Sequence, residues 1–156
     1  MSRWFALCLL FCLVLGIPSS LIFAQEEQEI AEHAARQLID VEYARAGDRS
    51  LRLDLLLPKQ PRDPMPLVVW VHGGGWKAGN KSGAGQAASL LKHGYAVASL
   101  EYRFSNVATF PAQIHDCKAG IRWLRAHAGE YGYDPNRIGV FGRSAGGHLV
   151  ALLHER

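Results

Sequence analysis

The stretch IGVFGRSAGG, residues 138–147, decides the fold that the sequence predicts. Its first four residues form a short and continuous apolar run, which is typical of a strand covered on both faces of a sheet. The pentapeptide Gly142–Gly146 follows with the pattern Gly-x-Ser-x-Gly, and a helix is expected from about Ser144 onward. A serine placed between a buried strand and a helix lies on a tight turn, which exposes its hydroxyl group.

Ser144 is therefore the candidate nucleophile. A serine hydroxyl attacks well only when it is exposed and held against a base. The flanking glycines permit a strained turn and keep side chains away from the reacting group. The backbone N–H of Ala145 and the positive end of the helix would face a developing oxyanion. The pentapeptide alone also fits a purely structural glycine-rich turn, so the interpretation depends on the strand and the helix around it.

A second glycine-rich motif, HGGGW at residues 72–76, follows the apolar run 67–71. Consecutive glycines, here Gly73, Gly74 and Gly75, let the backbone approach a ligand closely and direct N–H groups at one point. A fixed donor of this kind stabilises a tetrahedral intermediate by about 3–4 kcal/mol. A phosphate-binding loop is the alternative, but the motif lacks a Gly-Lys-Ser/Thr ending and the dinucleotide spacing. We interpret His72 as a brace of this loop through hydrogen bonds, rather than as a general base.

The rest of the chain alternates strands and helices. Residues 38–45 and 51–57 carry apolar side chains at alternate positions and predict an antiparallel strand pair, followed by a proline-rich loop at 58–66. The elements expected after this loop are a strand at 67–71, a helix at 82–93, a strand at 96–100, a helix at 111–128 and a strand at 138–141. This order predicts an α/β fold with a mostly parallel sheet and helices on both faces. Because both motifs follow buried strands, they can meet at one crevice of such a sheet.

The first 24 residues differ from the rest. Arg3 precedes an uncharged apolar run at 4–15, Gly16 and Pro18 interrupt it, and Ala24 provides a small residue before a very polar segment. This pattern predicts a signal peptide at 1–24 and a secreted or periplasmic protein that leaves the membrane once the leader is cleaved. A retained membrane anchor is the alternative. Residues 25–37 are rich in helix formers and predict a short surface helix or a tether.

Composition and cysteine usage limit the other functions. The chain has 156 residues, 49% of them hydrophobic and 20% charged, as in one ordinary globular domain. Its net charge of +3 comes from scattered basic residues, which argues against a nucleic-acid partner. Cys8 and Cys12 lie in the predicted leader, so Cys117 has no partner for an internal disulfide. Cys117 falls on the apolar face of the 111–128 helix, where we interpret it as a packing residue.

Several motifs together resemble those of the α/β-hydrolase fold esterases and lipases. The matching residues are HGGGW at 72–76, EYRF at 101–104, Pro111 with Ile114 and Asp116, and the segments DPNRI at 134–138 and GRSAGGHL at 142–149. They agree in order and spacing over residues 38–156, and are most similar to the hormone-sensitive-lipase-like and the acetyl-xylan and feruloyl-esterase-like groups. The resemblance implies an α/β-hydrolase fold, represented here by its N-terminal part and truncated after the helix that follows the nucleophile.

The resemblance also implies roles for individual residues. Ser144 would be the nucleophile, and Gly74, Gly75 and Ala145 would donate to the oxyanion. Trp76 would border the acyl or alcohol pocket, next to His72 and Gly73, while Arg103 and Asp116 would form a structural ion pair. No metal and no organic cofactor is implied, and the substrate would be a small-molecule or polysaccharide-linked ester.

The sequence departs from the family after the nucleophile. In this fold the catalytic acid and base follow the serine along the chain. The candidates within residues 145–156 are His148, His154 and Glu155, and none of them occupies the position of the usual acid or base. We therefore expect a serine carboxylic-ester hydrolase whose acid and base lie outside this chain. The alternatives are a catalytically inactive fragment, and a peptidase or lactone hydrolase of the same fold.

Overall fold

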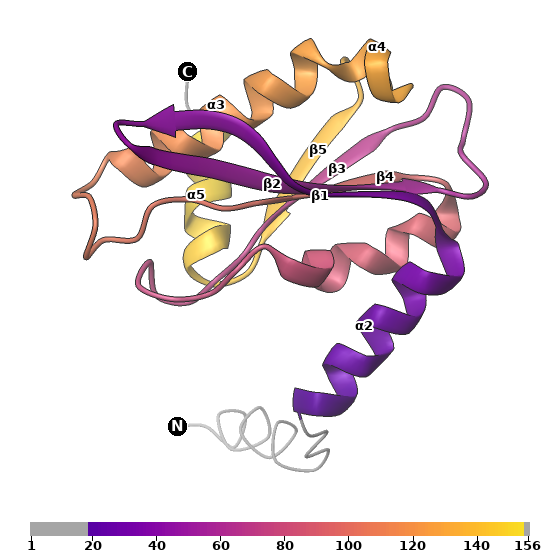
Figure 1. Cartoon of the computed structure of the whole chain (residues 1–156), viewed down its shortest axis with the longest axis horizontal. Coiled ribbons are helices and arrows are strands. Elements are labelled where there is room, and N and C mark those ends of the chain that lie inside the picture. Colours follow the sequence, from indigo (N-terminus) through magenta and orange to yellow (C-terminus); the bar gives the residue numbers. More distant parts are fainter. Residues whose placement is uncertain (1–18, 155–156) are drawn as a thin grey trace, which may run out of the picture.

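The computed structural model of the chain describes residues 19–154 (Figure 1). Residues 1–18 of the predicted signal peptide, with Cys8 and Cys12, lie outside this range, as does Glu155.

A five-stranded sheet runs through the described part of the chain. Its strands are β1 (Ala34–Ala46), β2 (Arg49–Pro58), β3 (Leu67–Val71), β4 (Ala96–Leu100) and β5 (Ile138–Gly142). They lie side by side in the order β1-β2-β4-β3-β5. β2 pairs antiparallel with β1 and β4, whereas β3 pairs in parallel with β4 and β5, so the sheet is mixed. The antiparallel β1–β2 pair and the parallel β3 and β5 agree with the predicted α/β fold.

Side chains alternate between the two faces of this sheet, and each face has its own apolar core. Along β3, Val69 and Val71 belong to the larger core, while Trp70 belongs to the smaller core on the opposite face. On β4, Ala98 faces the larger core and Val97 the smaller one. Because both faces are covered, β3 is apolar at every position and β4 at all but Ser99.

Helices supply these two covers. They are α2 (Ser19–His33), η1 (Ser82–His93), α3 (Ala112–Ala126), α4 (Ala128–Tyr131) and α5 (Ala145–His154). Residues of α3 and α5 pack into the larger core, and residues of α2 and η1 pack into the smaller one. Figure 1 shows α3 and α4 on one side of the sheet and α2 on the other. The helix predicted at 111–128 is therefore present as α3, which begins directly after Pro111 and ends at Ala126, and the short helix α4 follows it.

The segment predicted as a helix at 82–93 is a 3-10 helix, η1, rather than an α-helix. Two consecutive residues near its start, Ala84 and Gly85, have positive φ angles of 64° and 55°, which a continuous α-helix does not allow. A Cβ atom on Gly85 would lie 2.5 Å from the indole ring of Trp70. The small residues of this segment therefore bring its backbone down onto the Trp70 ring.

The boundary between α2 and β1 corrects the expectation for residues 25–37. The segment is helical only to His33, and residues 34–37 belong to β1, where Arg36 pairs with Leu57 and Gln37 pairs with Leu56. Lys59 ends the helix, because its backbone N–H donates to the carbonyl of His33 at 2.8 Å. Its ammonium group also donates to carbonyls in the last turn. Residues 19–154 contain no helix that is long and apolar enough to cross a membrane.

Cys117 lies in the larger core and is fully buried. Burial raises the pKa of its thiol to about 12, so the thiolate is not available at neutral pH. The structure therefore agrees with a packing role for this residue.

We predict that Gly85→Ala lowers the free energy of unfolding by about 1–3 kcal/mol more than Gly47→Ala does. Both glycines have positive φ, but a Cβ on Gly47 would meet nothing within 4 Å. The Gly47 variant therefore reports the backbone cost alone, and the difference reports the contact with Trp70. Urea denaturation of the two variants measures this difference, and equal losses would contradict the close packing of η1 on Trp70.

Candidate active site

Ser144 lies on the turn between β5 and α5. Its φ angle is 53°, in the left-handed region that side chains other than glycine rarely adopt. The turn is closed by two backbone hydrogen bonds, from Gly146 N–H to the Arg143 carbonyl at 2.9 Å and from His148 N–H to the Ser144 carbonyl at 3.1 Å. Ser144 is exposed. The local structure is therefore the strained, exposed turn that the sequence predicts.

Gly142 and Gly146 allow this turn to press against the end of β3. A Cβ on Gly142 would lie 2.6 Å from the Val71 carbonyl oxygen, and a Cβ on Gly146 would overlap the same oxygen. Val71 is the last residue of β3, and His72 follows it directly. The two glycines thus bring Ser144 to the point where the HGGGW loop begins.

The HGGGW loop lies directly against Ser144. A Cβ on Gly73 would be 3.4 Å from Ser144 Cβ and 2.8 Å from the Arg143 carbonyl oxygen. Gly74 and Gly75 have positive φ angles of 118° and 61°, and the Gly74 carbonyl accepts the N–H groups of Lys77 and Ala78. The structure therefore brings together the two motifs that the sequence placed at one crevice.

His72 is buried beneath this loop. Its carbonyl accepts a hydrogen bond from the Tyr102 hydroxyl at 3.0 Å, and its ring stacks on the Tyr102 ring with centroids 4.5 Å apart. Its Nδ1 lies 2.8 Å from the Gly73 carbonyl oxygen, to which the neutral ring can donate. Burial lowers the pKa of His72 in spite of this hydrogen bond, so the ring is neutral at pH 7. These contacts support a bracing role for His72. They do not place its ring as a general base for Ser144.

Trp76 stands at the exposed end of the loop. Its φ angle is 60°, and its side chain is 38% exposed. The indole meets the His148 ring edge to face, with centroids 5.4 Å apart, and His148 lies one helical turn after Ser144. Its carbonyl accepts the Ser105 N–H at 2.8 Å. The predicted pocket residue Trp76 therefore lies beside the α5 helix that carries Ser144.

The predicted ion pair between Arg103 and Asp116 is present and joins the loop after β4 to α3. The Arg103 guanidinium group donates to both carboxylate oxygens of Asp116, Nε to Oδ2 at 2.8 Å and Nη2 to Oδ1 at 2.7 Å. The backbone N–H of Arg103 donates to the same carboxylate at 3.0 Å. This bidentate geometry fixes the segment that also carries Tyr102, the partner of His72.

Within residues 19–154 the hydrogen bonds of the histidine rings go to backbone carbonyls, as with His72 and His127, and none joins Ser144 to a histidine or a carboxylate. The residues searched also contain no group of three or more His, Cys, Asp or Glu side chains that could hold a metal ion. The described site therefore contains an exposed serine beside the backbone of a glycine-rich loop, and no described side chain forms a hydrogen bond with the serine hydroxyl.

Sequence reasoning missed one group next to the site, formed by Lys81, Asp54 and Asp40. The HGGGW loop continues from His72 to Lys81, just before η1. The Lys81 ammonium group lies 2.7 Å from Asp54 Oδ1 and 2.8 Å from Asp40 Oδ1. The available signal was Asp54 itself, the acidic residue inside the leucine-rich run 51–57. A charge in such a strand is buried only when it has a partner.

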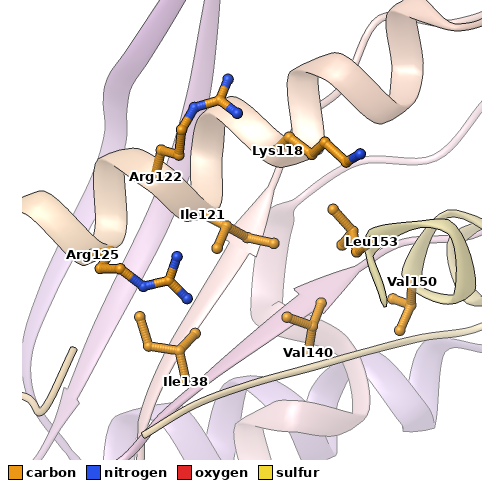
Figure 2. Close-up of a pocket in the computed structure, with 8 residues that line it drawn as sticks. All are labelled: Lys118, Ile121, Arg122, Arg125, Ile138, Val140, Val150 and Leu153. Carbon is orange, nitrogen blue, oxygen red and sulfur yellow. The ribbon is translucent and has the colours of Figure 1, made fainter. Parts of the chain in front are cut away.

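A groove with a volume of about 480 Å³ lies between α3, β5 and α5 (Figure 2). Its apolar lining is Ile121, Ile138, Val140, Val150 and Leu153, and its basic lining is Lys118, Arg122 and Arg125. None of the predicted site residues lines it. The groove therefore belongs to the outer edge of the sheet at β5 and not to the Ser144 site.

We predict that Gly146→Ala disrupts the turn, whereas Gly147→Ala is tolerated. A Cβ on Gly146 would overlap backbone atoms of Val71, while one on Gly147 would lie 3.2 Å from the nearest atom, the Gly142 carbonyl oxygen. We expect Gly146→Ala to lower the free energy of unfolding by about 1–3 kcal/mol or more and Gly147→Ala to change it by less than about 1 kcal/mol. Thermal denaturation of both variants checks this, and similar losses would count against the close approach of the turn to β3.

Acid should weaken the fold through His72. Because the pKa of His72 is lowered in the folded chain, the unfolded chain binds more protons below the ordinary histidine value of about 6.5. The stability that the neutral ring provides is present above that pH and is lost as the pH falls through it. Each linked proton changes the slope by about 1.4 kcal/mol per pH unit. We expect the free energy of unfolding to fall between about pH 7 and pH 5, and to fall less steeply in His72→Gln. The same slope in both proteins would contradict this.

The chain is similar to known proteins over the range that carries both motifs. The sequence model of the BD-FAE family matches residues 53–154, a range that includes both motifs. A probable isoprenylcysteine alpha-carbonyl methylesterase of Oryza sativa subsp. japonica is 40% identical over 101 residues, covering 64% of this chain and 24% of that protein. The carboxylesterase NlhH of Mycobacterium tuberculosis is 40% identical over 100 residues, covering 63% of this chain and 31% of that protein.

A solved structure described as a truncated form of a carbohydrate esterase from gut microbiota has a TM-score of 0.68 and 38% identity, and the match covers 76% of this chain and 43% of that one. The match thus spans 24% and 31% of the length of these two curated relatives. Because the family model matches more than half of the chain and the solved structure shares its fold, the chain belongs to the BD-FAE family of α/β-hydrolase fold carboxylic-ester hydrolases.

Proposed function

We propose that this chain carries the nucleophile and the oxyanion hole of a serine carboxylic-ester hydrolase. The observation that carries the proposal is the contact between the two motifs, in which the backbone of Gly73 packs against Ser144. Gly74 and Gly75 follow Gly73 in the same loop, directly after the residue that contacts Ser144. The names of the relatives, a methylesterase and a carboxylesterase, support the reaction class.

In the proposed reaction Ser144 Oγ attacks the ester carbonyl carbon and gives up its proton to a general base. The carbonyl oxygen becomes an oxyanion, which accepts hydrogen bonds from the N–H groups of Gly74, Gly75 and Ala145. Because these donors are fixed before the reaction, they stabilise the charge without reorganisation. The bond to the alcohol then breaks, the alcohol takes up a proton, and Ser144 keeps the acyl group. Attack by water on this acyl-enzyme releases the acid and restores the serine.

The acid and the base of this mechanism are proposed to lie outside the 156 residues. His72 is buried with its Nδ1 against the Gly73 carbonyl, and His148 contacts Trp76. Triad members act as a unit, so a chain without a base loses most of the acceleration. The chain on its own is then at most a weak catalyst, and an inactive fragment is the second candidate.

The substrate is proposed to be an ester with a short acyl group, either a small molecule or one linked to a polysaccharide. The open backbone of residues 73–75 supports esters over peptides or lactones. Similarity to the solved carbohydrate esterase supports an acylated sugar. The leader predicted at 1–24 supports export to a secreted or periplasmic location, where such substrates would be met.

The test measures acylation of Ser144 rather than turnover, since the base is proposed to lie outside this chain. We expect intact-mass analysis after incubation with p-nitrophenyl acetate to show one slow acyl addition to the chain, located at Ser144 and lost in Ser144→Ala. Added imidazole should accelerate it, because a small base can take the place of the proposed external one. Ser105→Ala, which removes another exposed serine near the loop, is the matched control and should be acylated like the original chain. Acylation that is unchanged in Ser144→Ala, or that never occurs with imidazole present, would refute the proposed function.

A further inference from the structure

Lys81 is a buried cation at the point where the HGGGW loop rejoins the body of the domain. Its ammonium group donates to Asp54 Oδ1 at 2.7 Å and also lies 2.8 Å from Asp40 Oδ1. Asp54 is only 4% exposed and belongs to β2, whereas Asp40 lies on β1 with its side chain half exposed. Three residues far apart in the sequence thus meet at the end of one loop.

The backbone of β1 is distorted at this contact. Asp40 has a φ angle of 58°, and the β1–β2 register shifts between Leu38 and Val41. The backbone N–H of Asp40 donates to Asp54 Oδ1 at 2.9 Å, the same oxygen that Lys81 contacts. A bulge re-aims a side chain at a chosen place in a strand. Here it directs the Asp40 carboxylate toward the Lys81 ammonium group.

Electrostatics favour the charged form of this cluster. Burial lowers the pKa of Lys81, but hydrogen bonds and charges from Asp40 and Asp54 outweigh it and raise the pKa above its ordinary value. The hydrogen bond from Lys81, with its positive charge, lowers the pKa of Asp40. The Lys81 ammonium group and the Asp40 carboxylate therefore each favour the charged form of the other.

Other contacts hold the start and the middle of the loop between His72 and Lys81. Residues 74–80 are all exposed. At the start, Tyr102 holds the His72 carbonyl, and in the middle Ser105 holds the Trp76 carbonyl. At the end of the loop, Lys81 contacts Asp54. Asp54 lies within the sheet, because it belongs to β2 and pairs with Ser99 of β4.

We propose that the pair of Lys81 and Asp54, completed by Asp40, positions the HGGGW loop by fixing its C-terminal end to the β1–β2 hairpin. Its consequence for catalysis rests on the proposed function, because it concerns the Gly74 and Gly75 donors beside Ser144. The anchoring itself does not. A buried ion pair is weak evidence for stability, since apolar residues of similar size often stabilise a fold equally well. What distinguishes this pair is its place, at the junction between an exposed loop and a buried strand.

Hydrogen exchange tests the anchor on the full chain. In Lys81→Met we expect the amide N–H groups of residues 73–80 to exchange about tenfold faster or more, with β3 and β4 unchanged, because local opening of the loop no longer breaks an ion pair. Lys81→Arg should restore slow exchange. Lys92→Met is the matched control, since Lys92 follows on η1 and pairs with Glu29 at a more exposed site. This variant should exchange like the original chain.

The double variant Lys81→Met with Asp54→Asn leaves no unpaired buried charge at this contact and guards against unfolding of the single variant. It should keep the sheet protected while the loop still exchanges faster. Uniform acceleration over the whole domain, or a loop that stays protected in the double variant, would overturn the proposal.

A second readout connects the anchor to the reaction. The rate of Ser144 acylation by p-nitrophenyl acetate, with imidazole present, should fall about tenfold or more in the double variant and remain unchanged in Lys92→Met. If the loop exchanges faster but the acylation rate is unchanged, the anchor holds the loop without positioning the Gly74 and Gly75 donors, and that part of the proposal is rejected. If the original chain is not acylated, the proposed function fails, while the exchange experiment still decides the anchor.

Discussion

The site depends on one close approach, that of the Ser144 turn to the end of β3. Gly142 and Gly146 both face the Val71 carbonyl oxygen so closely that neither position has room for a Cβ atom. β3 pairs with β4 on one side and β5 on the other, so the position of Val71 is set by the sheet rather than by the loops. The nucleophile and the HGGGW loop meet because each begins where one of two adjacent parallel strands ends.

This arrangement stores strain in places that the core supports. Ser144, Trp76, Asp40 and Ala84 all have positive φ angles although none of them is glycine, and each such residue costs about 1–3 kcal/mol. Strain of this kind persists only where the surroundings over-determine the backbone. Asp40 and Trp76 are held by backbone hydrogen bonds, Ala84 by burial in the smaller core, and Ser144 by the close approach of its turn to β3.

Much of this structure could be predicted, because it follows from patterns that are local in the sequence. The buried strands β3 and β4 agree residue by residue with their apolar runs, and the ion pair of Arg103 and Asp116 agrees with its prediction. The pairing of β1 with β2 was also foreseen, but not its start at Ala34, since this depends on Lys59 ending the helix. The 3-10 form of η1 depends on contact with Trp70. The helix or strand propensity of a segment cannot predict either contact, because each one involves a residue far away in the sequence.

The cluster of Lys81, Asp54 and Asp40 was not predicted for a similar reason. It also helps to distinguish two requirements of the site, support of the loop and a general base. Asp54 is visible in the sequence as a charge within an apolar strand, but its partner Lys81 is found only once the strands are placed. An oxyanion loop of the proposed kind needs rigid support, and His72, Tyr102 and Lys81 make contacts at the two ends of the loop. A general base needs an accessible nitrogen or carboxylate beside Ser144, and the buried, neutral His72 offers neither. In the proposed mechanism, support for the transition state and transfer of the serine proton are therefore tasks for different groups, of which the described residues fit the first.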